Sequence, residues 1–430
     1  MSRPTRSHER RAWLGCLALL VAAALRLTSL DQPPARYADE VDYALDARGQ
    51  FAGSPAVLAT LPPPPPGVAT LAGDLTWWHP PLAKLLIGRG QAGAGDDPLG
   101  WRIAPALCGV LGVAVAYALA WQLLRSAWWA ALAALLLASD GLHVVQSRMA
   151  MLDVFLATFA GGGVLCLVLA WRARHSGRRS AFLVLAGLFF GAALASKWAA
   201  LLLLLPAALA AAEVARRAMG WKAALRTLAV LALVPLAVYL ASYGEWFVRR
   251  GPDVAGFVRL QAAMLDYGRG FQRPNPYASP AASWPLLLRP FRYYYAPQGA
   301  PVKTERQILA LGNPALWWSW LGLAPIALWA AARQRSAAAG LAVGGYLCCW
   351  APWLLVGRTT FLYYLLPGVP FMAVGAAAAC HALRPRLGRA LGLGLAAAAG
   401  GLALAFAPHW LGLSIPVAWS HSLGWLSGWR

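Results

Sequence analysis

The chain has 430 residues, of which 60% are hydrophobic and only 12% are charged, and its mean hydropathy is +0.54. Soluble domains are nearer half apolar and a quarter charged, so this composition excludes an ordinary water-soluble enzyme and a disordered chain. A net charge of +21 would suggest nucleic-acid binding if it lay on a polar surface, but here the basic residues are interleaved with Leu- and Ala-rich runs. We therefore expect a lipid bilayer, and no nucleic acid, to be the partner of this charge.

A helix needs about twenty mostly apolar residues to cross a bilayer. The sequence predicts about eleven such spans, at residues 13–30, 104–123, 127–142, 152–171, 181–196, 198–214, 226–246, 311–332, 337–356, 361–382 and 390–407. The first span has no small-residue cleavage site, so we interpret it as an anchor rather than a cleaved signal peptide. The six cysteines lie in apolar segments without metal-ligand spacing, which favours small core residues. The expected fold is an all-α polytopic membrane protein.

The distribution of charge predicts the orientation of these spans. With the N-terminus on the cytoplasmic side, the short inner loops carry 18 Lys and Arg residues against two acids, Glu9 and Glu213. Such an excess is what the positive-inside rule requires. Two long segments, 31–103 and 247–310, then lie on the outer side, and loops of this length usually carry function. We treat residues 1–430 as one integral membrane domain with these two outer loops.

An acidic pair follows the first span directly. Asp39 and Glu40 lie just above the expected bilayer. Adjacent carboxylates there suit a general base or metal ligands, and a solvated loop face is the alternative. Further along the same outer loop, His79 precedes two prolines and an amphipathic stretch, which is also typical of a simple anchor in the headgroup layer.

A second polar cluster lies between two apolar spans. It contains Asp140, His143, Arg148 and Asp153. Each of these groups would need a buried partner or a water-filled cavity at membrane depth, so together they are hard to explain as packing. A helix-capping role for Asp140 and Asp153 is the structural alternative.

Isolated cations occur at the expected outer ends of spans. Lys197 and Arg358 lie at such positions, and each could pair with lipid phosphate nonspecifically. Together with Arg102 and Arg148 they could instead form one site for a phosphorylated ligand, because guanidinium groups bind phosphate through paired donors and Lys binds it as a point charge.

Several sequence motifs resemble those of the protein O-mannosyltransferase family, and they occur in the same order along the chain. They are HPPLAKLLIG from His79, DGLHVVQSRMAMLDVFL from Asp140, ASKW from Ala195, NPYASP and SWPLLLRPFRYYY between Asn275 and Tyr295, LGNPALWW from Leu311, and RTTFLYYLLPGVPF from Arg358. With the acidic pair, the matches run from Asp39 to Phe371 and cover most of the chain.

This resemblance implies a membrane glycosyltransferase of the GT-C type, with two long outer loops. Such an enzyme transfers mannose from polyprenyl-phosphate-mannose to Ser or Thr hydroxyls of exported proteins, with inversion at the anomeric carbon and with the translocon as a possible meeting place. Eukaryotic members insert a β-trefoil (MIR) module in the later outer loop, which about sixty residues here have no room for. The chain is therefore similar to a bacterial form in the cell (inner) membrane, with its active site on the outer side.

The resemblance also implies roles for the polar residues. Asp39 is expected to be the base, with Glu40 assisting it. The cations Arg102, Lys197, Arg358 and Arg148 are expected to bind the donor phosphate, and His79, Asp140, His143 and Asp153 are expected to position substrate. The residues predict no dedicated metal cage and no cofactor, although some GT-C relatives use a divalent metal, which leaves metal dependence open.

Two other functions fit the same sequence. A GT-C transferase that moves a sugar from polyprenyl phosphate onto a lipid or glycan, such as the lipid A aminoarabinose transferases, would share the fold and the carrier. A lipid flippase or transporter would explain the spans and buried charges, but it would not explain acid pairs and amphipathic stretches on one side.

Overall fold

The structure is a computed structural model that describes residues 13–52, 77–272 and 274–429. Part of the expected first outer loop, residues 53–76, therefore lies outside the described residues. Within the described ranges, nine helical segments are long and apolar enough to cross a membrane. They are α6 (Pro98–Leu124), α9 (Asp153–Arg172), α10 (Ser176–Leu194), η1 (Trp198–Ala200) with α11 (Leu201–Met219), α12 (Trp221–Ser242), α15 (Pro314–Arg333), α16 (Ala337–Trp350) with η3 (Ala351–Leu355), η4 (Leu362–Gly368) with α17 (Val369–Ala382), and α18 (Pro385–Leu411).

Two further apolar segments complete the bundle. Helices α7 (Ala127–Ala138) and α8 (Gly141–Ser147) form one more span if they are counted together, and they are bent by 63° where they meet. Helix α2 (Trp13–Leu27) has 15 residues and falls short of the span length. The structure thus confirms an all-helical membrane bundle with nine or ten spans by length and composition, whereas we expected about eleven. The expected count is one higher because it included α2 as a span.

Helix α17 occupies the centre of the bundle. In its span, Leu362–Ala382, 94% of the most apolar window is buried inside the protein. A helix that is apolar on all sides is stable only where other helices surround it, and α17 packs against α7, α15 and α16. In the peripheral spans α10, α11, α12 and α18 only 28% of that window is buried, so most of their apolar surface is left for lipid.

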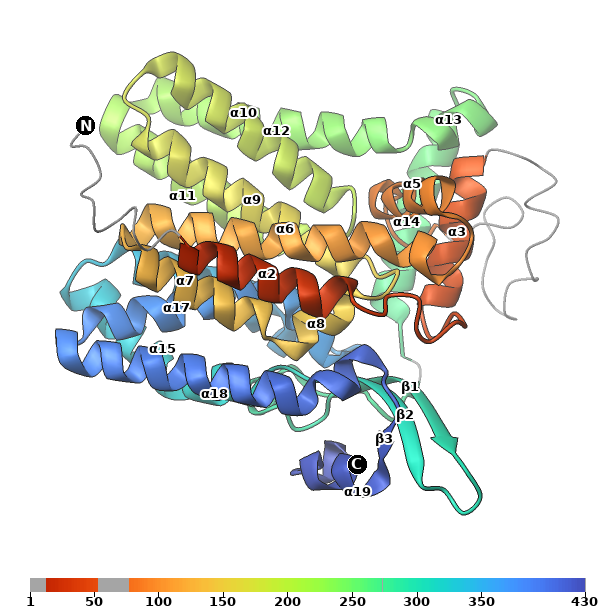
Figure 1. Cartoon of the computed structure of the whole chain (residues 1–430). Coiled ribbons are helices and arrows are strands. Elements are labelled where there is room, and N and C mark those ends of the chain that lie inside the picture. Colours follow the sequence, from red (N-terminus) through yellow and green to blue (C-terminus); the bar gives the residue numbers. More distant parts are fainter. Residues whose placement is uncertain (1–12, 53–76, 273, 430) are drawn as a thin grey trace.

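The remaining elements lie outside these spans. They are α3 (Glu40–Ala52), α5 (Leu82–Ala94), α13 (Gly244–Arg250), α14 (Val254–Gly270), η2 (Ala281–Leu286), β1 (Phe291–Gln298), β2 (Thr304–Ala310), β3 (Ile415–Pro416), α19 (Val417–Leu423) and η5 (Ser427–Trp429). Of these, α3, α5, α13, α14 and the strands gather at one end of the bundle (Figure 1). The strands form an antiparallel sheet in the order β1-β2-β3, with a register shift between Arg292 and Tyr294. The connections α9–α10 and α11–α12 lie at the opposite end (Figure 1).

The bend between α7 and α8 is held by a buried carboxylate. Asp140 accepts hydrogen bonds from the backbone N–H of His143 (3.0 Å), the backbone N–H of Asn313 (2.9 Å) and the indole Nε1–H of Trp317 (2.7 Å). It therefore caps α8 and ties it to the start of α15, which is the capping alternative that the sequence left open. Because three donors satisfy one fully buried acid, the group is stable at this depth.

We predict that Asp140→Ala destabilises the bundle. The variant leaves the Trp317 indole and two backbone N–H groups without acceptors, each at a cost of about 1–3 kcal/mol. Thermal unfolding in detergent should show a lower midpoint for Asp140→Ala than for Asp140→Asn, which keeps one acceptor oxygen. Equal midpoints for the two variants and the parent would contradict this role.

Candidate active site

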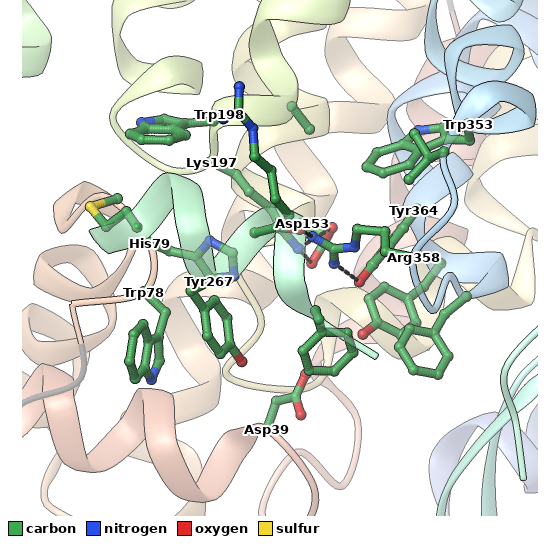
Figure 2. Close-up of a pocket in the computed structure, with 18 of the residues that line it drawn as sticks. Asp39, Trp78, His79, Asp153, Lys197, Trp198, Tyr267, Trp353, Arg358 and Tyr364 are labelled. Carbon is green, nitrogen blue, oxygen red and sulfur yellow. Dashed lines mark hydrogen bonds and ion pairs between the residues drawn. The ribbon is translucent and has the colours of Figure 1, made fainter. Parts of the chain in front are cut away.

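A cavity of about 1000 Å³ opens at the end of the bundle where α3, α5 and α14 gather. Its wall includes the acids Asp39, Asp42 and Asp153, together with His79 and several cations and aromatic rings. Figure 2 shows Asp39 on one side of this cavity and Lys197, Asp153 and Arg358 on the other. Residues from seven distant parts of the chain, near positions 40, 80, 155, 200, 270, 291 and 360, thus face one space.

Asp39 lies in the turn that leads into α3. The preceding residue, Ala38, has a φ of 48°, a left-handed conformation that is uncommon for a residue with a side chain. Burial raises the pKa of the Asp39 carboxyl to about 6, the Lys197 ammonium opposes this rise, and the carboxylates of Asp42 and Asp153 add to it. A carboxylate with a pKa near 6 is ionised at neutral pH and is a stronger base than an ordinary Asp.

Lys197 and Asp153 form an ion pair on the opposite wall. The Lys197 Nζ lies 2.9 and 2.8 Å from the two oxygens of Asp153, which is 2% exposed. The ammonium also lies 5.5 Å from the ring centre of Tyr364. This pairing holds Lys197 in place at the cavity surface, and it gives Asp153 a structural partner as well as a place in the wall.

Arg358 projects into the same cavity from the segment between η3 and η4. Its Nη1 donates to the Gly268 carbonyl (2.5 Å), its Nη2 donates to the Tyr364 hydroxyl (2.7 Å), and its Nε donates to the Thr359 carbonyl (3.4 Å). A guanidinium has five N–H donors, so each terminal nitrogen keeps one further N–H for a ligand. The Arg358–Tyr364 contact is visible in Figure 2.

The structure places Arg102 away from the cavity wall, which corrects our expectation that it binds the donor phosphate. Its Nε and Nη2 donate to the two oxygens of Glu40 (2.9 and 2.8 Å), and the other three N–H groups donate to the carbonyls of Leu30, Pro33 and Ala35. Arg102 and Glu40 are both fully buried. With all five donors in use, the guanidinium has none left for a phosphate.

Glu40 has a second partner beside Arg102. Its Oε1 accepts a hydrogen bond from the backbone N–H of Ala150 (3.1 Å). The carboxylate therefore links the start of α3 to α6 and to the segment after α8. Glu40 is absent from the cavity wall, so it sets the position of the turn that carries Asp39 rather than facing a substrate.

Three other residues that we expected to contact substrate also lie outside the cavity wall. Arg148 donates to the carbonyls of residues 25, 26, 28 and 29, where it satisfies the end of α2. His143 is fully buried and its Nδ1 lies 2.7 Å from an Arg26 nitrogen. Asp140 caps α8, as described above. The physical reason is similar for each: partners inside the bundle engage these polar groups, although the His143 Nε2 has no hydrogen-bond partner among the described residues.

His79 does lie in the cavity wall, as expected of a positioning residue. Burial lowers the pKa of its imidazole well below the usual range, and the cations Lys197, Lys84 and Arg358 lower it further. The ring is therefore neutral at physiological pH. A neutral imidazole both donates and accepts one hydrogen bond, which suits contact with a sugar hydroxyl.

Sequence reasoning missed part of the wall. Tyr267 and Arg269 come from α14, and the Tyr267 ring stacks on Trp78 with centres 4.2 Å apart. Stacked aromatic faces at a cavity wall suit an apolar face of a sugar ring. No sequence pattern had indicated these two residues, because their position at the cavity depends on the tertiary fold. Among the described residues, no three His, Cys, Asp or Glu side chains are grouped closely enough to hold a metal ion.

The fold and the cavity define a polytopic helical membrane protein with an acid and cations around one terminal cavity. The family model "Dolichyl-phosphate-mannose-protein mannosyltransferase" matches residues 16–245, and the model "C-terminal four TMM region of protein-O-mannosyltransferase" matches residues 254–429. The chain therefore belongs to the protein O-mannosyltransferase family, as the resemblance of its motifs implied.

Characterised relatives are similar along most of the chain. The polyprenol-phosphate-mannose--protein mannosyltransferase of Mycolicibacterium smegmatis is 28% identical over 361 residues, which cover 70% of each chain. The enzyme of the same name from Corynebacterium glutamicum is 25% identical over 423 residues, covering 82% of this chain and 81% of that one.

Two solved structures share the fold. A chain of the S. cerevisiae protein O-mannosyltransferase complex bound to the sugar donor has a TM-score of 0.82 at 15% identity, covering 100% of this chain and 93% of that one. ArnT from Cupriavidus metallidurans bound to undecaprenyl phosphate has a TM-score of 0.64 at 18% identity, covering 92% and 76%. The GT-C fold is thereby confirmed for this chain.

We predict that Arg102→Met lowers the stability of the whole bundle. The substitution leaves the Glu40 carboxylate buried without its cation, and breaking a buried pair in this way costs about 3–5 kcal/mol. Thermal unfolding in detergent measures the loss, and the double variant Arg102→Met/Glu40→Gln should recover part of it. If Arg102→Met melts like the parent and only donor binding is weaker, the guanidinium binds phosphate after all.

Proposed function

We propose that this protein transfers mannose from polyprenyl-phosphate-mannose to Ser or Thr hydroxyls of polypeptides. Family membership and the names of its relatives support a protein mannosyltransferase. The observation that carries the proposal is the arrangement of Asp39 across one cavity from Lys197 and Arg358. This arrangement can supply both a base for a hydroxyl and cations for a leaving phosphate.

Asp39 acts as the general base in this proposal. A Ser or Thr hydroxyl is a poor nucleophile, so a carboxylate must hold it and accept its proton as the O–C1 bond forms; such help is worth about 10²–10⁴ in rate. The raised pKa of Asp39, about 6, suits this task. Glu40, which we expected to assist directly, instead positions the Asp39 turn through Arg102 and the Ala150 N–H.

Arg358 and Lys197 stabilise the departing phosphate. As the C1–O bond to the carrier breaks, negative charge develops on the phosphate oxygens, and fixed cations stabilise that state more than the ground state. The two spare N–H groups of Arg358 can approach two phosphate oxygens, while Lys197 contributes a point charge held by Asp153. Attack from the Asp39 side, opposite the phosphate, inverts the anomeric carbon, so a β-linked donor gives an α-linked product.

The location of the site follows from the charge pattern. The cavity lies at the end of the bundle opposite the α9–α10 and α11–α12 connections, which are rich in Arg. We propose a cell (inner) membrane protein with a cytoplasmic N-terminus and its active site on the outer side. Exported polypeptides then meet the enzyme as they emerge, at the translocon, and transfer uses this chain's own residues.

We predict that Asp39→Asn lowers transfer about a hundredfold or more, because an amide does not accept the proton. In the parent enzyme the transfer rate should rise as pH increases through about 6, because only ionised Asp39 is active. The residual rate of Asp39→Asn should not show this rise. The assay incubates purified protein with radiolabelled polyprenyl-phosphate-mannose and a Ser/Thr peptide.

The products of this assay separate the alternatives. Labelled peptide supports protein mannosylation, labelled lipid or glycan supports an aminoarabinose-transferase-like acceptor, and movement of the donor across a vesicle membrane without transfer supports a flippase. Full activity of Asp39→Asn would show that Asp39 is not the general base.

We predict that Arg358→Ala lowers kcat about a hundredfold, the typical cost of removing one donor to a developing oxyanion. Arg358→Lys should recover part of the rate, because it restores the positive charge but not the paired N–H donors of the guanidinium. The matched control is Arg259→Ala, whose side chain on α14 is 71% exposed and absent from the cavity wall. Rates are measured at saturating peptide with varied donor; equal effects of the two Ala variants would contradict a phosphate contact.

A further inference from the structure

The sheet at the cavity end of the bundle has an open edge. Its order is β1-β2-β3, so β1 pairs with β2 on one side only. The β1–β2 hairpin projects away from the helices (Figure 1). Among the described residues, no backbone hydrogen bond reaches Phe291 to Pro297 from outside the β1–β2 ladder. Within the part of the chain that the structure describes, the free edge of β1 therefore presents unpaired backbone groups, which are a template for another strand.

This open strand starts at the active site. Phe291, its first residue, is part of the cavity wall. Three residues later the ring of Tyr294 packs against Tyr37, with centres 5.6 Å apart, and Tyr37 is two residues before Asp39. Strand β1 thus runs from the cavity, past the turn that carries Asp39, to the tip of the hairpin.

The chemistry of one proline indicates which groups face outward. Pro297 pairs opposite Glu305 and has no N–H to donate to β2, so its nitrogen suits the free edge. In an antiparallel ladder the inward and outward positions alternate, which places the N–H and C=O of Tyr295 on the free edge too. Tyr295 is 51% exposed, so this part of the strand is accessible.

We propose that the acceptor polypeptide binds as an added β-strand along the free edge of β1, which guides its hydroxyl residue into the cavity beside Asp39. This inference rests on the proposed function, since it takes the acceptor to be a polypeptide. Backbone hydrogen bonds give affinity that is independent of side chains, while side chains alternate between the two faces of the added strand. Such docking suits an enzyme that must accept many sequences and present one hydroxyl at a time.

Backbone N-methylation of the peptide tests the docking with the parent enzyme. Each peptide in the set contains one acceptor Ser and one backbone N-methyl group. The methyl group sits at a different residue beside the Ser in each peptide. Each methyl that removes a strand hydrogen bond should raise the peptide KM about three- to tenfold, and methyls at the positions between should have little effect. The donor KM should not change. An effect with no two-residue period overturns the proposal.

A variant pair tests the enzyme side. Tyr295→Pro removes the outward N–H, whereas Tyr295→Val keeps it and loses the same phenol ring. Tyr295→Pro should raise the peptide KM about three- to tenfold over Tyr295→Val, with kcat and the donor KM unchanged. Equal peptide KM values overturn the proposal; if Tyr295→Pro does not fold, the methylated peptides decide alone.

The two proposals fail in different ways. If no unmodified peptide receives mannose from polyprenyl-phosphate-mannose, the proposed function is wrong. If unmodified peptides are mannosylated but neither the methyl scan nor the variant pair shows the expected difference, only the docking on β1 is wrong.

Discussion

The buried pair between Arg102 and Glu40 is the interaction on which the site depends. One guanidinium satisfies two carboxylate oxygens and three carbonyls, and the same carboxylate accepts from the Ala150 N–H. Through these bonds α6, the segment after α2 and the segment after α8 are held against one another. Asp39 precedes Glu40 directly, so the position of the proposed base is set by a charge pair that lies outside the cavity wall. A buried pair of this kind is costly to form and costlier to break, which makes the geometry all-or-none.

The same physics separates structural charges from chemical ones throughout the bundle. A charged group inside a membrane protein is stable only with partners, and Arg148 and Asp140 have backbone or indole partners that use their capacity locally. Arg358 differs because its hydrogen-bond partners occupy only some of its N–H groups. Asp39 differs because burial raises the pKa of its carboxyl, and no ion pair to it occurs among the described residues. Both of these groups face the cavity. Unused hydrogen-bonding groups at a cavity wall therefore indicate a role in substrate binding better than the mere presence of a charge at membrane depth does.

The cavity also has two different kinds of neighbour. Along the membrane it is walled by helices whose outer surface is apolar and suits a lipid-linked donor. On the other side it borders a sheet with a free edge, which suits an extended polypeptide. A transferase that joins a lipid-bound sugar to a protein needs both kinds of approach, and they meet at Asp39. In the proposed reaction, the lipid-linked donor and the polypeptide acceptor would therefore approach Asp39 from different sides of the cavity.

Composition and local pattern alone determined that the chain is a helical membrane protein and where nearly all its spans lie, because hydrophobicity over about twenty residues is a local property. The motifs also identified the family. Tertiary structure decided which charges meet. Lys197, Asp153 and Arg358 share one cavity, whereas Arg102 and Arg148 satisfy buried backbone and acid groups. Tyr267 of α14, which no sequence pattern had indicated, lines the same cavity. The physical reason is that a charged group's role depends on the partners left to it after folding, and those partners lie far away in the sequence.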